Sequence, residues 1–442
     1  MPRLLVLLAL ALSACATAQP PTPAPEIEDA AEPPASDEMV ERPRNVVLMI
    51  ADGFGPASAA LGAAAKGAPL VLDGILVGSS ETSSADSRVT DSAAGATAYS
   101  CGLKTYNGAI GVDADRRPCR TVLEAAEAAG LATGLVATSR VTHATPASFA
   151  SHVESRAEEA EIARQLAGSD VEVLFGGGGQ YLVDSLTSAM AADGWAVALD
   201  RDGYDRLDTV PAAAILAPSH LAYEIDRDET DQPSLAEMAT TALDLLAASA
   251  DGRQRGFFLM IEGSRIDHAA HANDPAAHAR EILAYDAAVA AVLDWAARDG
   301  TTLVVSTADH ETGGMTLGRD DIYAWDPAPL LAATASFEAM AAALQAGGDP
   351  ATVVRDGLAL DELPAGTEDA IRGAVASGDP YALGPVVRDL ASVPAGIGWT
   401  TGGHTAVDVG LYASGPGAAR FAGRHTNDAV GRLLFEALGL DR

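Results

Sequence analysis

Three kinds of residue are scarce in this sequence, and each shortage narrows what the protein can be. Aromatic residues make up only 5% of the 442 residues, so alanine, valine and leucine must fill most of the core. Lysine and arginine together number 28, against 61 aspartates and glutamates, and the formal net charge is −33. So acidic a surface argues against nucleic acid or an anionic lipid surface as a general partner. An anionic substrate would have to be attracted by local cations rather than by the surface as a whole.

Cysteine is the third scarce residue, and it occurs only at positions 15, 101 and 119. No two of these have the C-x-x-C spacing of a thiolate metal site or a redox motif. Cys101 and Cys119 can form one disulfide in an oxidising compartment or stay as separate thiols. Their spacing alone does not decide between the two.

Several common catalytic motifs are also missing. The sequence has no Walker lysine motif and no G-x-S-x-G nucleophile elbow. The glycine run 176–179 does not continue as the dinucleotide pattern G-x-G-x-x-G, because Tyr181 takes the last position. We interpret these glycines as a tight exit from a strand.

The N-terminal segment has the features of a processing signal. Its apolar run at 4–11 follows a basic start and is too short to cross a bilayer as a mature helix. Residues 12–15, Leu-Ser-Ala-Cys, resemble a bacterial lipobox, so we assign residues 1–15 to a signal peptide with Cys15 as the lipidated residue. The alternative is plain secretion after cleavage beyond Ala18. Both predict export to the periplasm, the outer membrane or the medium. Residues 16–43 are rich in Pro, Ala and Glu and are predicted to be a disordered tether.

The rest of the chain, residues 44–442, alternates strand and helix patterns. Short apolar runs predict buried strands at 45–51, 132–138, 171–175, 257–262, 302–308 and 408–413. Alanine-rich stretches predict helices at 92–101, 121–129, 155–167, 233–249 and 276–298. The alternation predicts an α/β fold, a three-layer αβα sandwich with a mostly parallel central sheet. Residues 319–395 lack the strand pattern, and we interpret them as an inserted helical or irregular subdomain over the site.

Acidic and imidazole side chains follow three of the predicted strands closely: Asp52, Glu262, Asp267, His271, Asp309 and His310. In an open α/β sheet the ligand crevice lies beyond the carboxyl ends of the strands. Three segments that are far apart in the sequence would therefore place these groups in one crevice. That is how a multi-metal site is assembled.

The spacing of the residues that follow the strand at 257–262 points to metal binding. Asp267 and His271 are four residues apart, so on a helical turn they share a face. His404 would add a third ligand, and three protein ligands with an open position are typical of a catalytic zinc. Taken alone, a D-x-x-x-H pattern is more often a surface pair. Without cations, the mutual repulsion of so many carboxylates in one crevice is unfavourable. Divalent ions would neutralise these charges and make the crevice attractive to phosphate.

Ser92 follows Asp91 at the predicted start of a helix, where free backbone N–H groups can hold a phosphate. An ordinary N-cap pair is the common alternative, and the functional interpretation depends on metals reaching the same place. Arg156 offers the planar fork that suits two phosphate oxygens. Of the other histidines, we interpret His152 and His278 as structural. We assign no role to His220 and His425.

Together these segments resemble the alkaline phosphatases. The matching stretches occur in the family's order at 45–55, 89–113, 141–156, 257–271, 303–314 and 400–405. Sulfatases and phosphoglycerate mutases share the fold but not the Asp-Ser nucleophile segment. The resemblance implies that Ser92 is the nucleophile that becomes phosphorylated, that Arg156 holds the phosphoryl oxygens and that Asp91 orients this arginine.

The resemblance also implies two zinc ions (Zn²⁺) and one magnesium ion (Mg²⁺). One zinc would take Asp267, His271 and His404, the other Asp52, Asp309 and His310, and magnesium Asp52, Thr145 and Glu262. His143 and His268 would lie beside the substrate and the third metal. Some members of the family have an acidic residue and a lysine at these two positions, so the third metal's identity and the pH optimum stay open.

The sequence therefore predicts a metal-dependent enzyme that hydrolyses small phosphate monoesters through a phosphoserine intermediate. Two alternatives are a phosphodiesterase or sulfatase on the same scaffold, and a non-catalytic lipoprotein that binds metal or phosphate. A passive binder would not need both Ser92 and Arg156, which favours the enzyme. The resemblance is also compatible with a homodimer.

Overall fold

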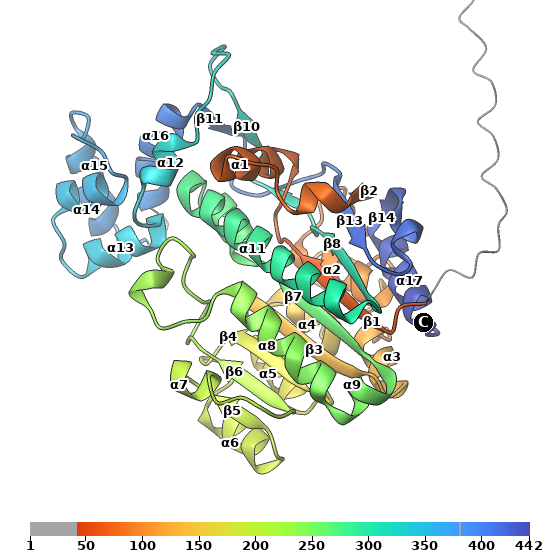
Figure 1. The fold of residues 1–442 in the computed structure, drawn as a ribbon. Coiled ribbons are helices and arrows are strands. Elements are labelled where there is room, and N and C mark those ends of the chain that lie inside the picture. The colour runs from red at the N-terminus through yellow and green to blue at the C-terminus, as the bar shows by residue number, and fades with distance from the viewer. Residues whose placement is uncertain (1–41, 380–381) are drawn as a thin grey trace, which may run out of the picture. The chain divides into compact units, whose positions relative to one another are not determined.

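The computed structural model describes residues 42–379 and 382–442 (Figure 1). The predicted signal peptide at 1–15, the lipobox cysteine and nearly all of the tether at 16–43 lie outside the described residues. Within the described part of the chain, none of the helices combines the length and the hydropathy needed to cross a membrane.

A ten-stranded sheet forms the centre of the fold, with strand order β14-β2-β13-β8-β1-β7-β3-β4-β6-β5. Its strands are β1 (Asn45–Ile50), β2 (Leu76–Glu81), β3 (Ala132–Arg140), β4 (Val173–Gly177), β5 (Ala196–Ala198), β6 (Ala212–Ile215), β7 (Phe257–Glu262), β8 (Thr302–Thr307), β13 (Val409–Ser414) and β14 (Gly423–Thr426). Among these strands only β13 runs antiparallel to its neighbours, β2 and β8. The predicted α/β fold with a mostly parallel sheet is confirmed.

The central strands are mostly apolar, with polar residues confined to their ends, because both faces of the sheet are covered. Every residue of β1, β7 and β8 is buried. The strands pair in parallel with Ile50 beside both Glu262 and Thr307. The carboxyl ends of all three strands therefore meet at one edge of the sheet, and the segments that follow them start side by side.

Helices cover both faces, and β1 shows how the core is divided between them. Val47 and Met49 belong to one apolar cluster, whereas Val46 and Leu48 belong to another, as expected for a strand whose side chains alternate. The first cluster includes α1 (Pro56–Lys66), α8 (Leu235–Ala248) and α11 (Pro275–Asp299). The second includes α2 (Ser92–Cys101), α3 (Val122–Ala128), α4 (Ala144–Ala150), α5 (Glu159–Ala167), α6 (Asp184–Ala192) and α17 (Asn427–Leu438). Three shorter helices complete this part: α7 (Arg201–Tyr204), α9 (Ala250–Arg255) and α10 (Arg265–His271).

The segment between β10 (Met315–Leu317) and β11 (Ile397–Trp399), where the sequence predicts an inserted subdomain at 319–395, is mainly helical in its described part. It contains α12 (Ala328–Ala332), α13 (Phe337–Gln345), α14 (Pro350–Gly357), α15 (Thr367–Ala376) and α16 (Leu383–Ala395), which gather beyond one end of α11 (Figure 1). Phe337, Met340 and Val354 are among the buried residues of its own apolar cluster. β10 and β11 pair antiparallel, so the chain leaves and re-enters the α/β body at adjacent positions.

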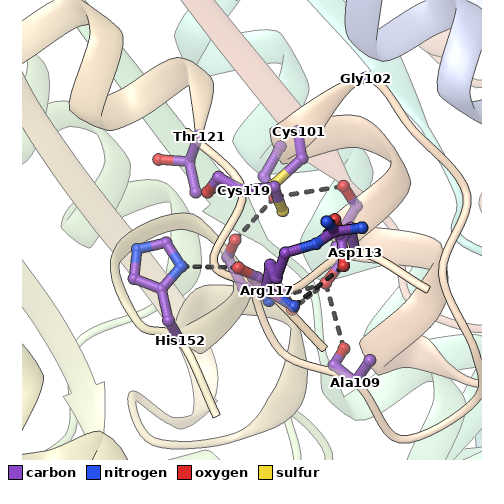
Figure 2. Close-up of a disulfide and its surroundings, with 12 residues drawn as sticks. Cys101, Gly102, Ala109, Asp113, Arg117, Cys119, Thr121 and His152 are labelled. Atoms are coloured by element: carbon purple, nitrogen blue, oxygen red, sulfur yellow. Dashed lines mark hydrogen bonds and ion pairs between the residues drawn. A yellow bond between two sulfur atoms is a disulfide. The ribbon is translucent and has the colours of Figure 1, made fainter. Parts of the chain in front are cut away.

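Cys101 and Cys119 form a disulfide, which settles the question that their spacing left open (Figure 2). Their Cα atoms lie 5.9 Å apart, within the ordinary range for a disulfide. The bridge ties the last residue of α2 to the segment that leads into α3. Nearby, His152 bonds to the Gly111 carbonyl (2.6 Å) and to Glu124 (2.7 Å), so this histidine is structural.

Candidate functional site

The carboxyl edge of the sheet holds a first group of buried side chains that could hold a metal ion, called here the first metal-binding group. Asp52 follows β1, and Asp309 and His310 follow β8. All three are fully buried, and their ligand atoms lie within 4.8 Å of one another. His310 Nε2 is 3.3 Å from Asp309 Oδ2 and 3.6 Å from Asp52 Oδ1. Thr312 Oγ1 lies 3.2 Å from His310 Nδ1, so a proton on that nitrogen leaves the Nε2 lone pair facing the carboxylates.

A second group joins α10 to the short strand β12 (His404–Thr405), which pairs with β9 (Glu311–Thr312). Asp267 and His271 lie one turn apart on α10, as their spacing predicts, and His271 Nε2 is 3.3 Å from Asp267 Oδ2. His404 Nε2 lies 3.7 Å from Asp267 Oδ1. Thr312 donates a hydrogen bond of 2.6 Å to Asp267 Oδ1.

The two histidines of this group point lone pairs at each other. His271 donates from Nδ1 to the Gly402 carbonyl (2.6 Å), and His404 donates from Nδ1 to the Thr90 carbonyl (2.8 Å). Both Nε2 atoms are then proton-free in the neutral rings, yet they lie only 3.0 Å apart. Two facing lone pairs repel each other unless a cation lies between them. Backbone carbonyls that orient imidazole ligands in this way are typical of metal sites.

A third group shares Asp52 with the first one. It adds Glu262, the last residue of β7, and His143, the N-cap of α4. Within the described residues, no hydrogen-bond partner is found for the buried atoms Thr145 Oγ1, Glu262 Oε1 and His143 Nδ1 or for either carboxylate oxygen of Asp52. Buried polar atoms without partners are rare in folded proteins, so this concentration of them fits a site for a bound cation.

The electrostatics of these carboxylates lead to the same conclusion. Burial, and then the charges of Asp309, Asp267 and Glu262, raise the pKa of Asp52 well above its ordinary value. Burial likewise raises the pKa of Asp309 to about 8 and that of Glu262 to about 7. The protein alone therefore disfavours charge on these groups. Two or more divalent cations would stabilise the ionised carboxylates, and the mixed oxygen and imidazole donors suit such ions.

Ser92 is the first residue of α2, so it places its hydroxyl at the N-terminus of that helix. Its side chain is buried, and its Oγ lies 3.2 Å from His310 Nε2. All ten residues of α2 are buried. Gly95 allows the helix to approach the site, because a Cβ at that position would come within 3.0 Å of Asp309 Cβ. The hydroxyl is thus held beside the first metal-binding group.

Asp91 caps α2 with one carboxylate oxygen and contacts Arg156 with the other. Its Oδ1 accepts hydrogen bonds from Ala94 N and Gly108 N, both 3.0 Å long, so it is an ordinary N-cap. Its Oδ2 accepts a hydrogen bond of 3.1 Å from Arg156. Arg156 also donates to His143 Nε2 at 3.1 Å. The guanidinium is therefore held at two points, by His143 and by Asp91, the residue that precedes Ser92.

The structure adds His220, to which the sequence assigned no role. Its ring centroid lies 4.3 Å from that of His268 and 5.5 Å from that of His143, and the His143 and His268 centroids are 5.3 Å apart. Burial, and then the nearby Arg265 and Arg140, lower the pKa of His220 to about 2. Both arginines are already ion-paired, Arg140 with Glu159 and Arg265 with Glu338.

All of the predicted site residues therefore gather in one region, at the carboxyl edge of the sheet. His425 lies elsewhere on the exposed surface, where its Nε2 contacts the Ala422 carbonyl (2.9 Å). His278 is buried and bonds to Ser58 (3.0 Å) and to the Ile266 carbonyl (3.0 Å), so it supports α10 from behind.

Comparisons with known proteins identify the family. The family model described as alkaline phosphatase matches residues 43–440. The chain is 39% identical to the alkaline phosphatase of Schizosaccharomyces pombe over 89% of this chain and 81% of that protein. It is 37% identical to alkaline phosphatase 3 of Bacillus subtilis over 89% of both chains. The crystal structure of a cold-active alkaline phosphatase from a Shewanella species superposes with a TM-score of 0.83 at 33% identity, covering 89% of this chain and 99% of that one. The Thermus thermophilus enzyme gives the same TM-score at 31% identity, covering 91% and 92%. The chain belongs to the alkaline phosphatase family of phosphomonoester hydrolases.

Proposed function

We propose that the enzyme hydrolyses phosphate monoesters through a phosphoserine intermediate on Ser92, at a site that holds two zinc ions and one magnesium ion. The observation that carries the proposal is the placement of Ser92. Its hydroxyl lies at the start of a buried helix, 3.2 Å from His310 Nε2, and the residue before it, Asp91, holds Arg156.

The donor groups suggest how the metals are distributed. One zinc would be held by Asp267, His271 and His404. The Nε2 atoms of the two histidines already lie close together. The other would be held by Asp52, Asp309 and His310. When bound, such ions supply Lewis-acid stabilisation of the attacking and leaving oxygens.

The third group suits magnesium bound by Asp52, Glu262 and Thr145. Arg156 can only donate, so His143 Nε2 accepts its hydrogen bond and the proton of the neutral ring lies on Nδ1. With that proton in place, His143 suits a position beside the metal as a hydrogen-bond donor better than a position as a ligand. Thr145 Oγ1 then supplies the remaining oxygen from the protein.

The chemistry of the chain itself follows from these positions. The Ser92 hydroxyl gives up its proton to solvent as its oxygen forms a bond to phosphorus, the bond from phosphorus to the ester oxygen breaks, and the released alkoxide takes up a proton from solvent. Water then attacks the phosphorus of the phosphoserine, the bond from phosphorus to the Ser92 oxygen breaks, and a proton from the water restores the hydroxyl as inorganic phosphate leaves. The N-terminus of α2 and the Arg156 fork stabilise the phosphoryl oxygens in both steps.

A panel of three substrates tests this proposal: an aryl phosphate monoester, the corresponding phosphodiester and the aryl sulfate. We expect kcat/KM for the monoester to exceed the other two by about 100-fold or more, because the second substituent of a diester and the lower charge of a sulfate each weaken binding of the transition state. Acid quenching during turnover of the monoester should also trap phosphate on a peptide that contains Ser92. A faster diester or sulfate reaction would assign the scaffold to that chemistry, and no turnover of any substrate would indicate a binding protein.

We also propose that the protein is exported and anchored through Cys15, with a free secreted form as the alternative. The Cys101–Cys119 disulfide supports an oxidising compartment. In cells fed labelled palmitate, the wild-type protein should carry the label and sediment with membranes, whereas Cys15→Ser should lose the label. Recovery of the protein from the cytoplasm with reduced thiols would contradict export.

A further inference from the structure

One buried arginine connects the insertion to the candidate active site. Arg265 is the first residue of α10, two positions before Asp267, and it is only 2% exposed. Its Nη2 donates a 2.9 Å hydrogen bond to Glu338 in the first turn of α13, where the glutamate side chain is 64% exposed. Its Nη1 lies 3.1 Å from His268 Nδ1.

The planar guanidinium group of Arg265 is held by stacking on an aromatic ring as well as by the contacts of its two Nη atoms. The guanidinium carbon lies 3.6 Å from the centre of the Tyr223 ring, and the tyrosine is buried. Arg265 Nε has no hydrogen-bond partner within the described part of the chain. A stacked guanidinium with two directional bonds has one orientation, which lysine cannot reproduce.

The contact with His268 determines where the proton of that ring lies. A guanidinium has five N–H groups and no acceptor, so Nδ1 must present its lone pair to Arg265. The single proton of the ring is then on Nε2. This is the reverse of His271 and His404, which donate from Nδ1 to backbone carbonyls. His268 therefore offers a hydrogen-bond donor where the other two histidines offer lone pairs.

We propose that Arg265 is a positioning residue, which holds His268 as the Nε2–H tautomer so that this histidine donates a hydrogen bond to the bound phosphoryl group, and that Glu338 of the insertion holds Arg265 in place. The part that concerns the phosphoryl group rests on the proposed function. The location supports it, because the ring of His268 packs against that of His143, whose Nε2 is bonded to Arg156.

The insertion is anchored independently of this arginine, so the link can be broken without displacing α13. Asp226 Oδ1 accepts a 3.0 Å hydrogen bond from Ser336 N, and Asp274 Oδ2 accepts one of 2.7 Å from Phe337 N. The other oxygen of Asp274 caps α11 through Ala276 N (3.1 Å) and Ala277 N (3.0 Å). These bonds set the start of α13 and hence the position of Glu338.

The test uses the metal-loaded enzyme and its variants Arg265→Met, Arg265→Lys and Glu338→Gln. Glu368→Gln is the matched control, because Glu368 is also an exposed glutamate of the insertion that pairs with an arginine, in this case the exposed Arg372. The tautomer is measured by NMR on protein labelled with ¹⁵N-histidine, with the His268 signals assigned by their loss in His268→Gln. Product affinity is measured as the inhibition constant of inorganic phosphate.

We expect the wild-type His268 to carry its proton on Nε2 and Arg265→Met to give a mixture of tautomers. The inhibition constant for phosphate should rise about tenfold in Arg265→Met, because a hydrogen bond to a charged group is weakened. Arg265→Lys, which keeps a donor, should recover part of this loss, and Glu338→Gln should have a smaller effect than Arg265→Met. Glu368→Gln should match the wild type in both measurements.

A proton on Nδ1 of His268 in the wild type, or an unchanged tautomer in Arg265→Met, would overturn the proposal. If Arg265→Met does not fold, Arg265→Lys and Glu338→Gln give the same comparison with milder changes. The NMR result does not require turnover, so a failure of the proposed function is recognised separately from a failure of this inference. An unchanged phosphate inhibition constant with an altered tautomer would show that His268 does not contact the phosphoryl group.

Discussion

Alanine at position 92 should lower kcat for an aryl phosphate by about 10⁴-fold or more, as expected when a covalent nucleophile is removed. The fold should survive the change. Asp91, and not Ser92, caps α2, and alanine is a good helix former. The Ser92 hydroxyl has one hydrogen-bonding contact, to His310 Nε2, so its removal leaves little unsatisfied. The loss should therefore be chemical rather than structural.

The measurement compares turnover, metal content and melting temperature of Ser92→Ala with those of the wild type. Ser100→Ala is the matched control, because Ser100 lies buried on the same helix and donates a 2.6 Å hydrogen bond to the Ser148 carbonyl. That variant should lose about 1 kcal/mol of stability and keep its activity. Near wild-type turnover by Ser92→Ala would refute the phosphoserine mechanism.

Asparagine at position 52 should have opposite effects on stability with and without metal. In the metal-free protein, both oxygens of Asp52 are buried without partners and are repelled by Asp309, Asp267 and Glu262. A neutral amide removes this repulsion and can donate to a neighbouring carboxylate, so the free energy of unfolding should rise by about 1–2 kcal/mol. In the metal-loaded protein, the same change removes a ligand shared by two groups, so stability and activity should both fall.

Urea unfolding of Asp52→Asn with and without a chelator, together with metal analysis by mass spectrometry, measures both effects. Asp286→Asn is a suitable control, because this buried aspartate has partners of its own in Lys66 (2.7 Å) and Val71 N (2.7 Å). It should lose stability equally in both conditions. If Asp52→Asn were destabilised by the same amount with and without metal, the buried carboxylates would not be a cation site.

The sequence predicted best those elements whose burial is complete. β1, β7 and β8 were placed within one residue of their observed bounds, because strands covered on both faces have continuous apolar runs rather than an alternating pattern. Convergence of the groups that follow these strands could also be predicted, since parallel strands end at one edge. The edge strand β14 and its neighbour β2 were missed, because half-exposed and glycine-containing stretches such as Leu76–Glu81 show no apolar run.

Other features depend on contacts that a single sequence does not reveal. The stretch at 408–413 was predicted as a strand within one residue, but its antiparallel direction follows from its place between β8 and β2. α4 was missed, because seven residues that include Pro146 and Ser148 give too short a pattern. His220 comes from a loop without neighbouring acidic or imidazole groups, so only the folded chain brings it to His143 and His268.

Asp274 has a consequence for how this enzyme could exchange parts with its relatives. Its buried carboxylate accepts hydrogen bonds from two helices: one oxygen caps α11, and the other accepts from the first amide of α13. In a homologue with a different helical module at this place, or with none, an aspartate at this position would keep one buried carboxylate oxygen without a hydrogen-bond donor. Grafting the helical module between family members therefore requires that the residue at position 274 travels with it.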